Sequence, residues 1–287
     1  MSAGVPKGLR YMAGGALSFS VMSAGAKLVG VRLPLFEIVA ARSLVVAMIA
    51  GAALYRRGDS FRGIDAHLLL RRAVIGFCAL SCYFYSVIHL PLADATVIYF
   101  VNPVLTALAA AVVLRERMGW KEVALVGLSL IGVVFVARPG FLFGAERALD
   151  PVAVALGILS AFFAAAAYVT IRQIQRDPPL LVVFYFSAVT VLLSAPFLLL
   201  GFTTPTLREV GIIIVMAVAT HVGQLWITWG FRMERAGRAS AVGYLQILFA
   251  AGWGWVLFSE VPDGWTWLGG GIIAVATLHL MRLHPAR

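Results

Sequence analysis

Long apolar runs, separated by short polar segments, recur along the whole chain. The clearest pair runs from Ala95 to Leu114 and from Ala124 to Ala137, with the charged segment 115–122 between them. At the helical rise of about 1.5 Å per residue, the first run is long enough to span the roughly 30 Å hydrocarbon core of a bilayer. This pattern predicts a helical hairpin in a membrane.

The same pattern predicts ten spans in all, so the expected fold class is an all-α membrane protein with ten transmembrane helices. The predicted spans are 9–29, 34–54, 73–90, 94–114, 121–138, 152–172, 180–201, 209–231, 238–258 and 264–283.

The hairpin returns in the second half of the chain. A shift of 144 positions lays it without gaps on Gly237–Leu283, so that Asn102 meets Gln246 and Glu116 meets Glu260. Five spans per half is an odd number, which inverts the second half in the membrane and predicts two inverted five-helix repeats, 1–142 and 143–287. The first span has a counterpart in the second half, so we expect it to be retained rather than cleaved as a signal peptide. This architecture is typical of transporters.

Composition supports a membrane protein and removes several other classes. Hydrophobic residues make up 61% of the chain and charged residues only 13%, which excludes a soluble domain. The net charge of +10 comes from short loops, so it favours a topology signal over nucleic-acid binding. The two cysteines, Cys78 and Cys82, lie inside an apolar run, so neither a disulfide framework nor a zinc site is expected. We expect no cofactor and no metal.

The distribution of Lys and Arg predicts the orientation. With a cytoplasmic N-terminus, the inner segments contain 17 of these residues, Arg71 and Arg72 among them, and the outer segments contain 4. Such a bias places both termini in the cytoplasm. Lys27 and Arg42 fall within spans and belong to neither group.

Several short motifs resemble the EamA-type ten-helix branch of the drug/metabolite transporter superfamily. They are Ala26-Lys27-Leu28, Ala41-Arg42-Ser43, Tyr83-Phe84-Tyr85, Asn102-Pro103-Val104, Leu114-Arg115-Glu116-Arg117, Ala239-Ser240-Ala241 and Ser259-Glu260. Ile247 stands where the family pattern usually has a proline. The resemblance implies a ten-helix transporter, and the length and aromatic spans resemble the YddG-type exporters of aromatic amino acids.

Polar stripes on the predicted helices indicate where a substrate could bind, because polar groups are costly in hydrocarbon. Each stripe follows one helical face: Cys78, Ser81, Cys82 and Tyr85; Tyr99, Asn102 and Thr106; His221, Gln224 and Thr228. For Cys78, Cys82 and Thr106 we favour helix packing, since small polar residues commonly hold membrane helices together.

Asn102 and Gln246 are the strongest candidates, because the repeat superposes two mid-span carboxamides and transporter sites commonly lie where repeats meet. Aromatic residues around them could stack on a ring while the amides bind a zwitterion. These are Tyr99, Tyr168, Trp226, Trp229 and Tyr244, with Tyr83 and Tyr85 as further candidates. We assign Trp253, Trp255, Trp265 and Trp267 to the aromatic belt at the membrane interface.

The intramembrane charges need partners or water. For Lys27 we rank an ion pair with Glu37 first, an anchor reaching the interface second, and a contact for a substrate carboxylate third. Arg42 has only Glu37 as a nearby carboxylate.

No Asp or Glu lies at mid-span, so coupling of transport through a buried carboxylate is not expected. This leaves facilitated diffusion, exchange, or a proton relay through His221 or His89.

These features predict a transporter in the bacterial inner membrane that exports small neutral or zwitterionic metabolites, aromatic or apolar amino acids above all, by alternating access. The alternatives within transport are sugars, nucleotide sugars, other metabolites or drugs. An enzyme is not expected, because no convergent catalytic set lies at mid-depth. A channel or scaffold would not require the inverted duplication. The expected partners are the small-molecule substrate and the lipid bilayer, and a monomer is compatible with the sequence.

Overall fold

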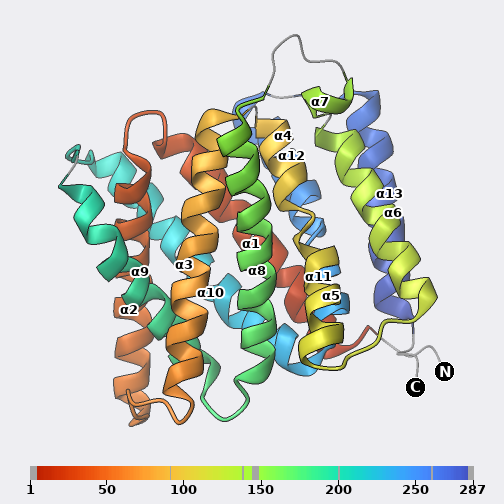
Figure 1. Ribbon diagram of the computed structural model, residues 1–287. Coiled ribbons are helices and arrows are strands. Elements are labelled where there is room, and N and C mark those ends of the chain that lie inside the picture. Colours follow the sequence, from red (N-terminus) through yellow and green to blue (C-terminus); the bar gives the residue numbers. More distant parts are fainter. Residues whose placement is uncertain are drawn as a thin grey trace.

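A computed structural model describes residues 5–90, 92–137, 139–143, 149–199, 201–259 and 261–283, which form a helical bundle without strands (Figure 1). Its helices are α1 (Lys7–Val29), α2 (Leu35–Arg57), α3 (Ala66–His89), α4 (Leu92–Tyr99), α5 (Asn102–Val113), α6 (Trp120–Ala137), α7 (Gly140–Phe143), α8 (Pro151–Gln173), α9 (Pro179–Leu198), α10 (Leu207–Met233), α11 (Ala236–Val242), α12 (Leu245–Phe258) and α13 (Gly264–Arg282).

Ten segments in these ranges are long and apolar enough to cross a membrane, and they coincide with the ten predicted spans. The all-α fold class is therefore confirmed. Polar residues fix several of the helix ends: Asp150 accepts a hydrogen bond from the N–H of Val152, and Thr206 and Glu209 form a reciprocal capping box. Two features differ from the prediction. Helix α3 begins at Ala66 rather than 73, and the fourth and ninth spans are each broken in the middle.

Helix pairing follows the inverted repeat. Helix α1 packs on α10, and their counterparts α8 and α3 pack on each other in the same way. The pairs α2 with α9 and α6 with α13 each join two equivalent helices of the two halves. Exchanging the halves therefore reproduces the main contacts, as expected for an inverted repeat.

The two breaks are related by the same symmetry. Helix α4 ends at Tyr99 and α5 begins at Asn102, while α11 ends at Val242 and α12 begins at Leu245. A shift of 144 positions lays Phe100 on Tyr244, and the centroids of these two rings lie 6.1 Å apart. The breaks therefore meet near the axis that relates the two halves.

The packing of the half-helices departs from this symmetry. Both termini lie at one end of the bundle, here called the terminal side, and the other end is the opposite side (Figure 1). On the terminal side α5 packs on α11, whereas on the opposite side the described residues of their counterparts α4 and α12 make no comparable contact. The described structure is therefore closed at the terminal side and separated at the opposite side.

Candidate functional site

The closed end brings α5 and α11 so close that only small residues fit between them. A Cβ atom added to Gly237 would lie 2.7 Å from the Cβ of Ala107 and 2.5 Å from the Sδ of Met118. The single Ser240 hydroxyl proton has two possible acceptors: the Gly237 carbonyl in its own helix at 3.0 Å and, across the contact, the Pro103 carbonyl of α5 at 3.5 Å. We call this contact between α5 and α11, formed by Pro103, Ala107, Met118, Gly237 and Ser240, the terminal-side gate.

A charged bridge reinforces the terminal-side gate. One oxygen of Glu116 accepts from the Nε of Arg172 at 2.9 Å, and the other accepts from the backbone N–H of Ala236 at 2.8 Å. Arg172 in turn donates to the carbonyl of Arg232 at 2.8 Å. Glu116 thus joins the end of α8 to the start of α11. Its counterpart, Glu260, lies outside the described residues.

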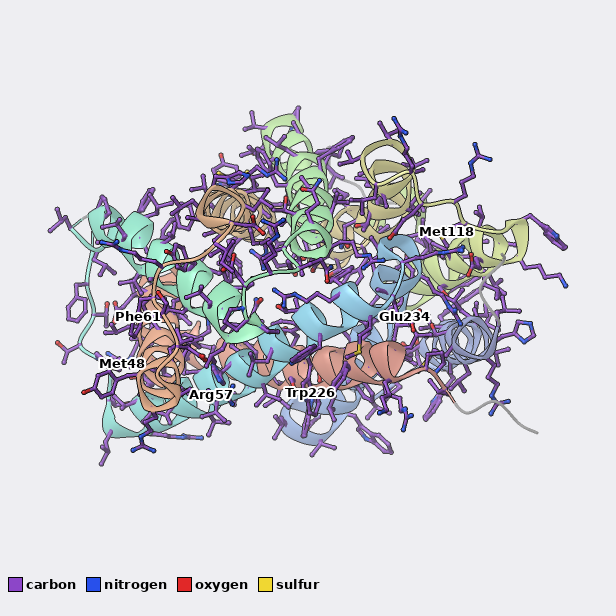
Figure 2. The ribbon with its side chains drawn as sticks, turned by 90° about the horizontal axis from the view of Figure 1, so that it is seen from below. Met48, Arg57, Phe61, Met118, Trp226 and Glu234 are labelled. Atoms are coloured by element: carbon purple, nitrogen blue, oxygen red, sulfur yellow. The ribbon has the colours of Figure 1, made fainter. Side chains whose placement is uncertain are left out.

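Arg238 holds α11 against α13 at the same end. Its guanidinium is buried and donates to the Leu280 carbonyl at 3.0 Å, with Glu122 at 4.0 Å and Glu234 at 3.9 Å. Burial raises the pKa of the Glu234 carboxyl, and the nearby Arg238 partly opposes this shift. Figure 2 looks onto the terminal side, where Met118 and Glu234 are labelled.

Tyrosines from α3, α4 and α8 gather in the middle of the bundle. The ring centroids of Tyr83 and Tyr99 are 4.5 Å apart, and Tyr168 stacks on Phe231 with centroids 4.7 Å apart. Tyr99 and Tyr168 lie within interaction range of each other and of Arg72. We call Arg72, Tyr83, Tyr99, Tyr168 and Gln224 the central cluster. It joins three of the predicted tyrosines to the predicted Gln224.

Arg72 is the charged member of the central cluster, and only 3% of its surface is exposed. Its Nη2 donates to Oε1 of Gln224 at 3.3 Å, and its guanidinium lies 4.4 Å from the centroid of the Phe186 ring. Its Nε and Nη1 atoms have no hydrogen-bond partner among the described residues. Burying an ion costs several kcal/mol, whereas a desolvated cation–π contact contributes about 2 kcal/mol and a hydrogen bond of this length little. The neighbouring residues therefore stabilise Arg72 only in part.

The two superposed amides have different surroundings. Asn102 is buried, and its Nδ2 donates at 2.9 Å to the carbonyl of Tyr99 across the break in the fourth span. Gln246 is half-buried, and its side chain makes no hydrogen bond within the described ranges. Asn102 thus supports the break, whereas the donor and acceptor of the Gln246 side chain have no protein partner among the described residues.

Several other candidates lie away from the central cluster. Trp226, at the edge of the bundle in Figure 2, is 37% exposed and covers Gly14 of α1. Tyr85 is equally exposed and stacks on His89. Tyr244 is fully buried beside Phe100. Ser81 and His221 are half-buried, each with a polar atom that has no partner in the described part of the chain.

The intramembrane charges do not pair as expected. Glu37 accepts from the backbone N–H of Thr203 at 2.9 Å and forms no ion pair with Lys27. The Lys27 ammonium instead lies 4.4 Å from the centroid of the Phe258 ring. The buried Arg42 donates to the Sδ of Met22 at 2.8 Å. The first-ranked interpretation of Lys27 was therefore wrong, because Glu37 is turned toward the 201–206 segment.

The tryptophan assignment also needs one correction. Trp253 donates from Nε1 to the Ser20 hydroxyl at 3.0 Å, so it joins α12 to α1 and is no simple interface residue. Trp255, Trp265 and Trp267 are exposed, as residues of an aromatic belt are.

Sequence reasoning missed Arg72 and the terminal-side gate. Arg72 was counted in a cytoplasmic segment, although it lies on one helical face with Gly76, Ala79 and Tyr83 at spacings of four, seven and eleven residues. That spacing is a signal that could have identified it. Glu116 was noted within the repeat and a family motif but not as part of a gate, because its partners Arg172 and Ala236 are distant in sequence. No group of three His, Cys, Asp or Glu that could hold a metal occurs in the described ranges.

Comparison with known proteins gives consistent results. The model of the EamA-like transporter family matches residues 6–138 and 151–282, one match in each half. A pseudopaline exporter of Pseudomonas aeruginosa is 37% identical over 92% of both chains. Human solute carrier family 35 member G1 is 28% identical over 84% of this chain and 69% of its own length. One solved crystal structure shares the fold, with a TM-score of 0.76 at 19% sequence identity. The match covers 92% of this chain and 94% of the other chain.

Proposed function

Because the chain belongs to the EamA-like transporter family, within the drug/metabolite transporter superfamily, we propose that it exports a small zwitterionic metabolite by alternating access. The observation that carries this proposal is the unequal packing of the half-helices. Helices α5 and α11 close the terminal side, while the equivalent α4 and α12 do not close the opposite side. An inverted repeat can exchange these two arrangements, which opens each side in turn.

The central cluster lies at the level where such an exchange would expose a substrate alternately to the two sides. Its tyrosine rings offer surfaces for stacking, and the amides of Gln224 and Gln246 offer donors and acceptors. In this proposal, Tyr83, Tyr99, Tyr168, Gln224 and Gln246 contact the substrate. Asn102 maintains the break that places Tyr99.

The direction of transport and the first test compound follow from the relatives. The pseudopaline exporter is similar over nearly its whole length, which supports export and makes pseudopaline the first compound to test. Aromatic and apolar amino acids form the second candidate class, because the central cluster is rich in tyrosine. The relatives also include a protein named as an S-adenosylmethionine uptake transporter of Rickettsia prowazekii, which is 22% identical. Transport into the cell is therefore the alternative direction, and observing it would contradict the proposed export.

We further propose that the protein resides in a bacterial inner membrane with both termini in the cytoplasm. The inner segments remain strongly basic even when Arg72, which lies within α3, is no longer counted with them. In this orientation the described structure opens outward.

The test is uptake into proteoliposomes of pseudopaline, labelled amino acids and a labelled sugar. We expect wild-type protein to carry pseudopaline or an aromatic amino acid but not the sugar. Tyr99→Ala and Gln246→Ala should each lower apparent affinity about 5- to 150-fold, the equivalent of roughly 1–3 kcal/mol. Tyr55→Ala is the control, since Tyr55 is 80% exposed at the end of α2. Wild-type affinity in both variants would rule out Tyr99 and Gln246 as substrate contacts and contradict the proposed site.

A further inference from the structure

We propose that Arg72 binds a carboxylate group of the transported substrate. The substrate would therefore be a carboxylic or amino acid rather than an amine, a sugar or a phosphate ester. This inference rests on the proposed function and identifies one contact within it. Its basis is the buried guanidinium in α3, whose Nε and Nη1 atoms have no partner among the described residues.

A guanidinium at this depth keeps its charge, because arginine is not deprotonated in proteins. Arg72 therefore differs from a buried lysine or histidine, which can become neutral when a partner is missing. Among the described residues, its hydrogen-bond and ring contacts are the Gln224 oxygen and the face of the Phe186 ring, and neither carries a negative charge. An ionisable residue inside a membrane span is by default a candidate for a functional site.

The geometry around Arg72 favours a ligand on the remaining side of its guanidinium. Gln224 and Phe186 occupy two directions, from α10 and α9. Gly76 lies one turn further along α3, where a Cβ atom would be 2.3 Å from Nη1, so the absence of a side chain at Gly76 lets the guanidinium extend along the helix. Tyr99 and Tyr168 lie within interaction range of it. Their hydroxyls can donate to a second oxygen of the same ligand.

The charge of the site selects a carboxylate. A guanidinium presents two pairs of parallel N–H groups, Nε with Nη2 and Nη1 with Nη2, and each pair matches the two oxygens of a carboxylate. Gln224 accepts from Nη2 alone, which carries two N–H groups, so one pair stays available to a ligand. A single guanidinium balances the single charge of that group. A phosphate monoester carries about −1.5 to −2 at pH 7 and would need a second cation. Arg42, the other buried arginine in a span of the first half, instead contacts Met22.

The structural alternative is that Arg72 only packs α3 against α9 and α10. In that case its removal would lower the stability of the protein without changing its choice of substrate. A comparison between acids and their amides separates the two roles, because the members of each pair differ mainly in the carboxylate.

The experiment measures concentration-dependent uptake into proteoliposomes of L-tyrosine and L-tyrosinamide, L-leucine and L-leucinamide, and pseudopaline. The proteins are wild type, Arg72→Gln, Arg72→Lys and the control Arg71→Gln. Arg71 is the adjacent residue, but it is exposed and donates to Gln173. Size-exclusion chromatography and thermal unfolding establish that each variant is folded.

We expect wild type and Arg71→Gln to carry an acid with a KM at least about 10-fold below that of its amide. Arg72→Gln should raise the KM for the acid about 10- to 100-fold and abolish the preference, while Arg72→Lys should retain part of it. The acid–amide comparison in wild type tests the proposal even if both Arg72 variants misfold. Equal uptake of acid and amide by wild type, or an unchanged preference in Arg72→Gln, overturns the carboxylate contact but leaves transport intact. Wild-type uptake of none of these compounds contradicts the proposed function as well.

Discussion

The Asn102 side chain supports the break in the fourth span by a local hydrogen bond. The sequence places Asn102 and Tyr99 on one helical face, and the structure joins them through the hydrogen bond from Nδ2 of Asn102 to the Tyr99 carbonyl. This carbonyl lies at the end of α4, where the helical hydrogen-bond pattern stops. The amide therefore replaces a bond that the broken helix cannot make.

We expect Asn102→Ala to destabilise the protein by about 0.5–1.5 kcal/mol, because it leaves the Tyr99 carbonyl without this donor. Thr106→Val is the matched control, since the Thr106 hydroxyl only bonds back to the Asn102 carbonyl within its own helix. The change should be measured as the shift of the thermal unfolding midpoint in detergent. A larger loss in Thr106→Val than in Asn102→Ala would contradict the assigned role.

Arg72 shows what a hydropathy pattern cannot resolve. The pair Arg71 and Arg72 reads as the end of a loop, because two adjacent cations normally stop a membrane span. In the structure they lie on different faces of α3, so Arg71 is exposed while Arg72 is buried. The difference arises from contacts with α9 and α10, which are distant in the sequence.

At the scale of elements, periodicity and length were sufficient to locate the spans, since helices in a membrane must be long and apolar. The breaks in the fourth and ninth spans were not predicted. Pro103 was the available signal for the first, because proline has no backbone N–H to donate to the carbonyl four residues earlier, which here is that of Tyr99. The second break has Gly243 and no proline, so only the symmetry with the first could have indicated it.

The bridge at Glu116 should contribute to closing the terminal-side gate. Glu116→Ala removes an acceptor from both Arg172 and the N–H of Ala236. We expect a cysteine at Thr106, which is fully buried in α5 next to the gate residue Ala107, to react about 3- to 10-fold faster with an impermeant maleimide. This corresponds to a shift of roughly 1 kcal/mol in the gate equilibrium.

This measurement uses a background in which Cys78 and Cys82 are replaced by serine, in vesicles that expose the terminal side. Arg117→Ala is the control, because the Arg117 side chain is exposed and only its carbonyl takes part in the gate. An unchanged rate in Glu116→Ala would show that helix packing alone holds the gate closed.

For the whole molecule, the distribution of Lys and Arg predicts the orientation in the membrane. A cysteine at Arg62, in the exposed loop between α2 and α3, should be protected from an impermeant thiol reagent in intact spheroplasts. A cysteine at Val31, which is 90% exposed in the loop between α1 and α2, should react. Permeabilisation should expose Arg62→Cys. Labelling of Arg62→Cys before permeabilisation would invert the topology.

The most direct test of alternating access is to force the terminal-side gate apart and observe both sides. Gly237→Ala introduces a Cβ 2.7 Å from that of Ala107, and such overpacking costs about 1–3 kcal/mol. The control is Gly252→Ala, because no atom lies within 4 Å of the added carbon. One reporter cysteine replaces Thr106. The other replaces Thr96, one turn before Tyr99 on α4.

The measurement is the rate of maleimide labelling at each reporter, from its own side of the membrane. Gly237→Ala should raise the rate at Thr106→Cys about 5- to 150-fold, the equivalent of roughly 1–3 kcal/mol, and lower the rate at Thr96→Cys, because an alternating-access carrier opens one side as the other closes. Gly252→Ala should leave both rates unchanged. If both reporters become more reactive in Gly237→Ala, the two sides open together as in a channel, and the account is contradicted.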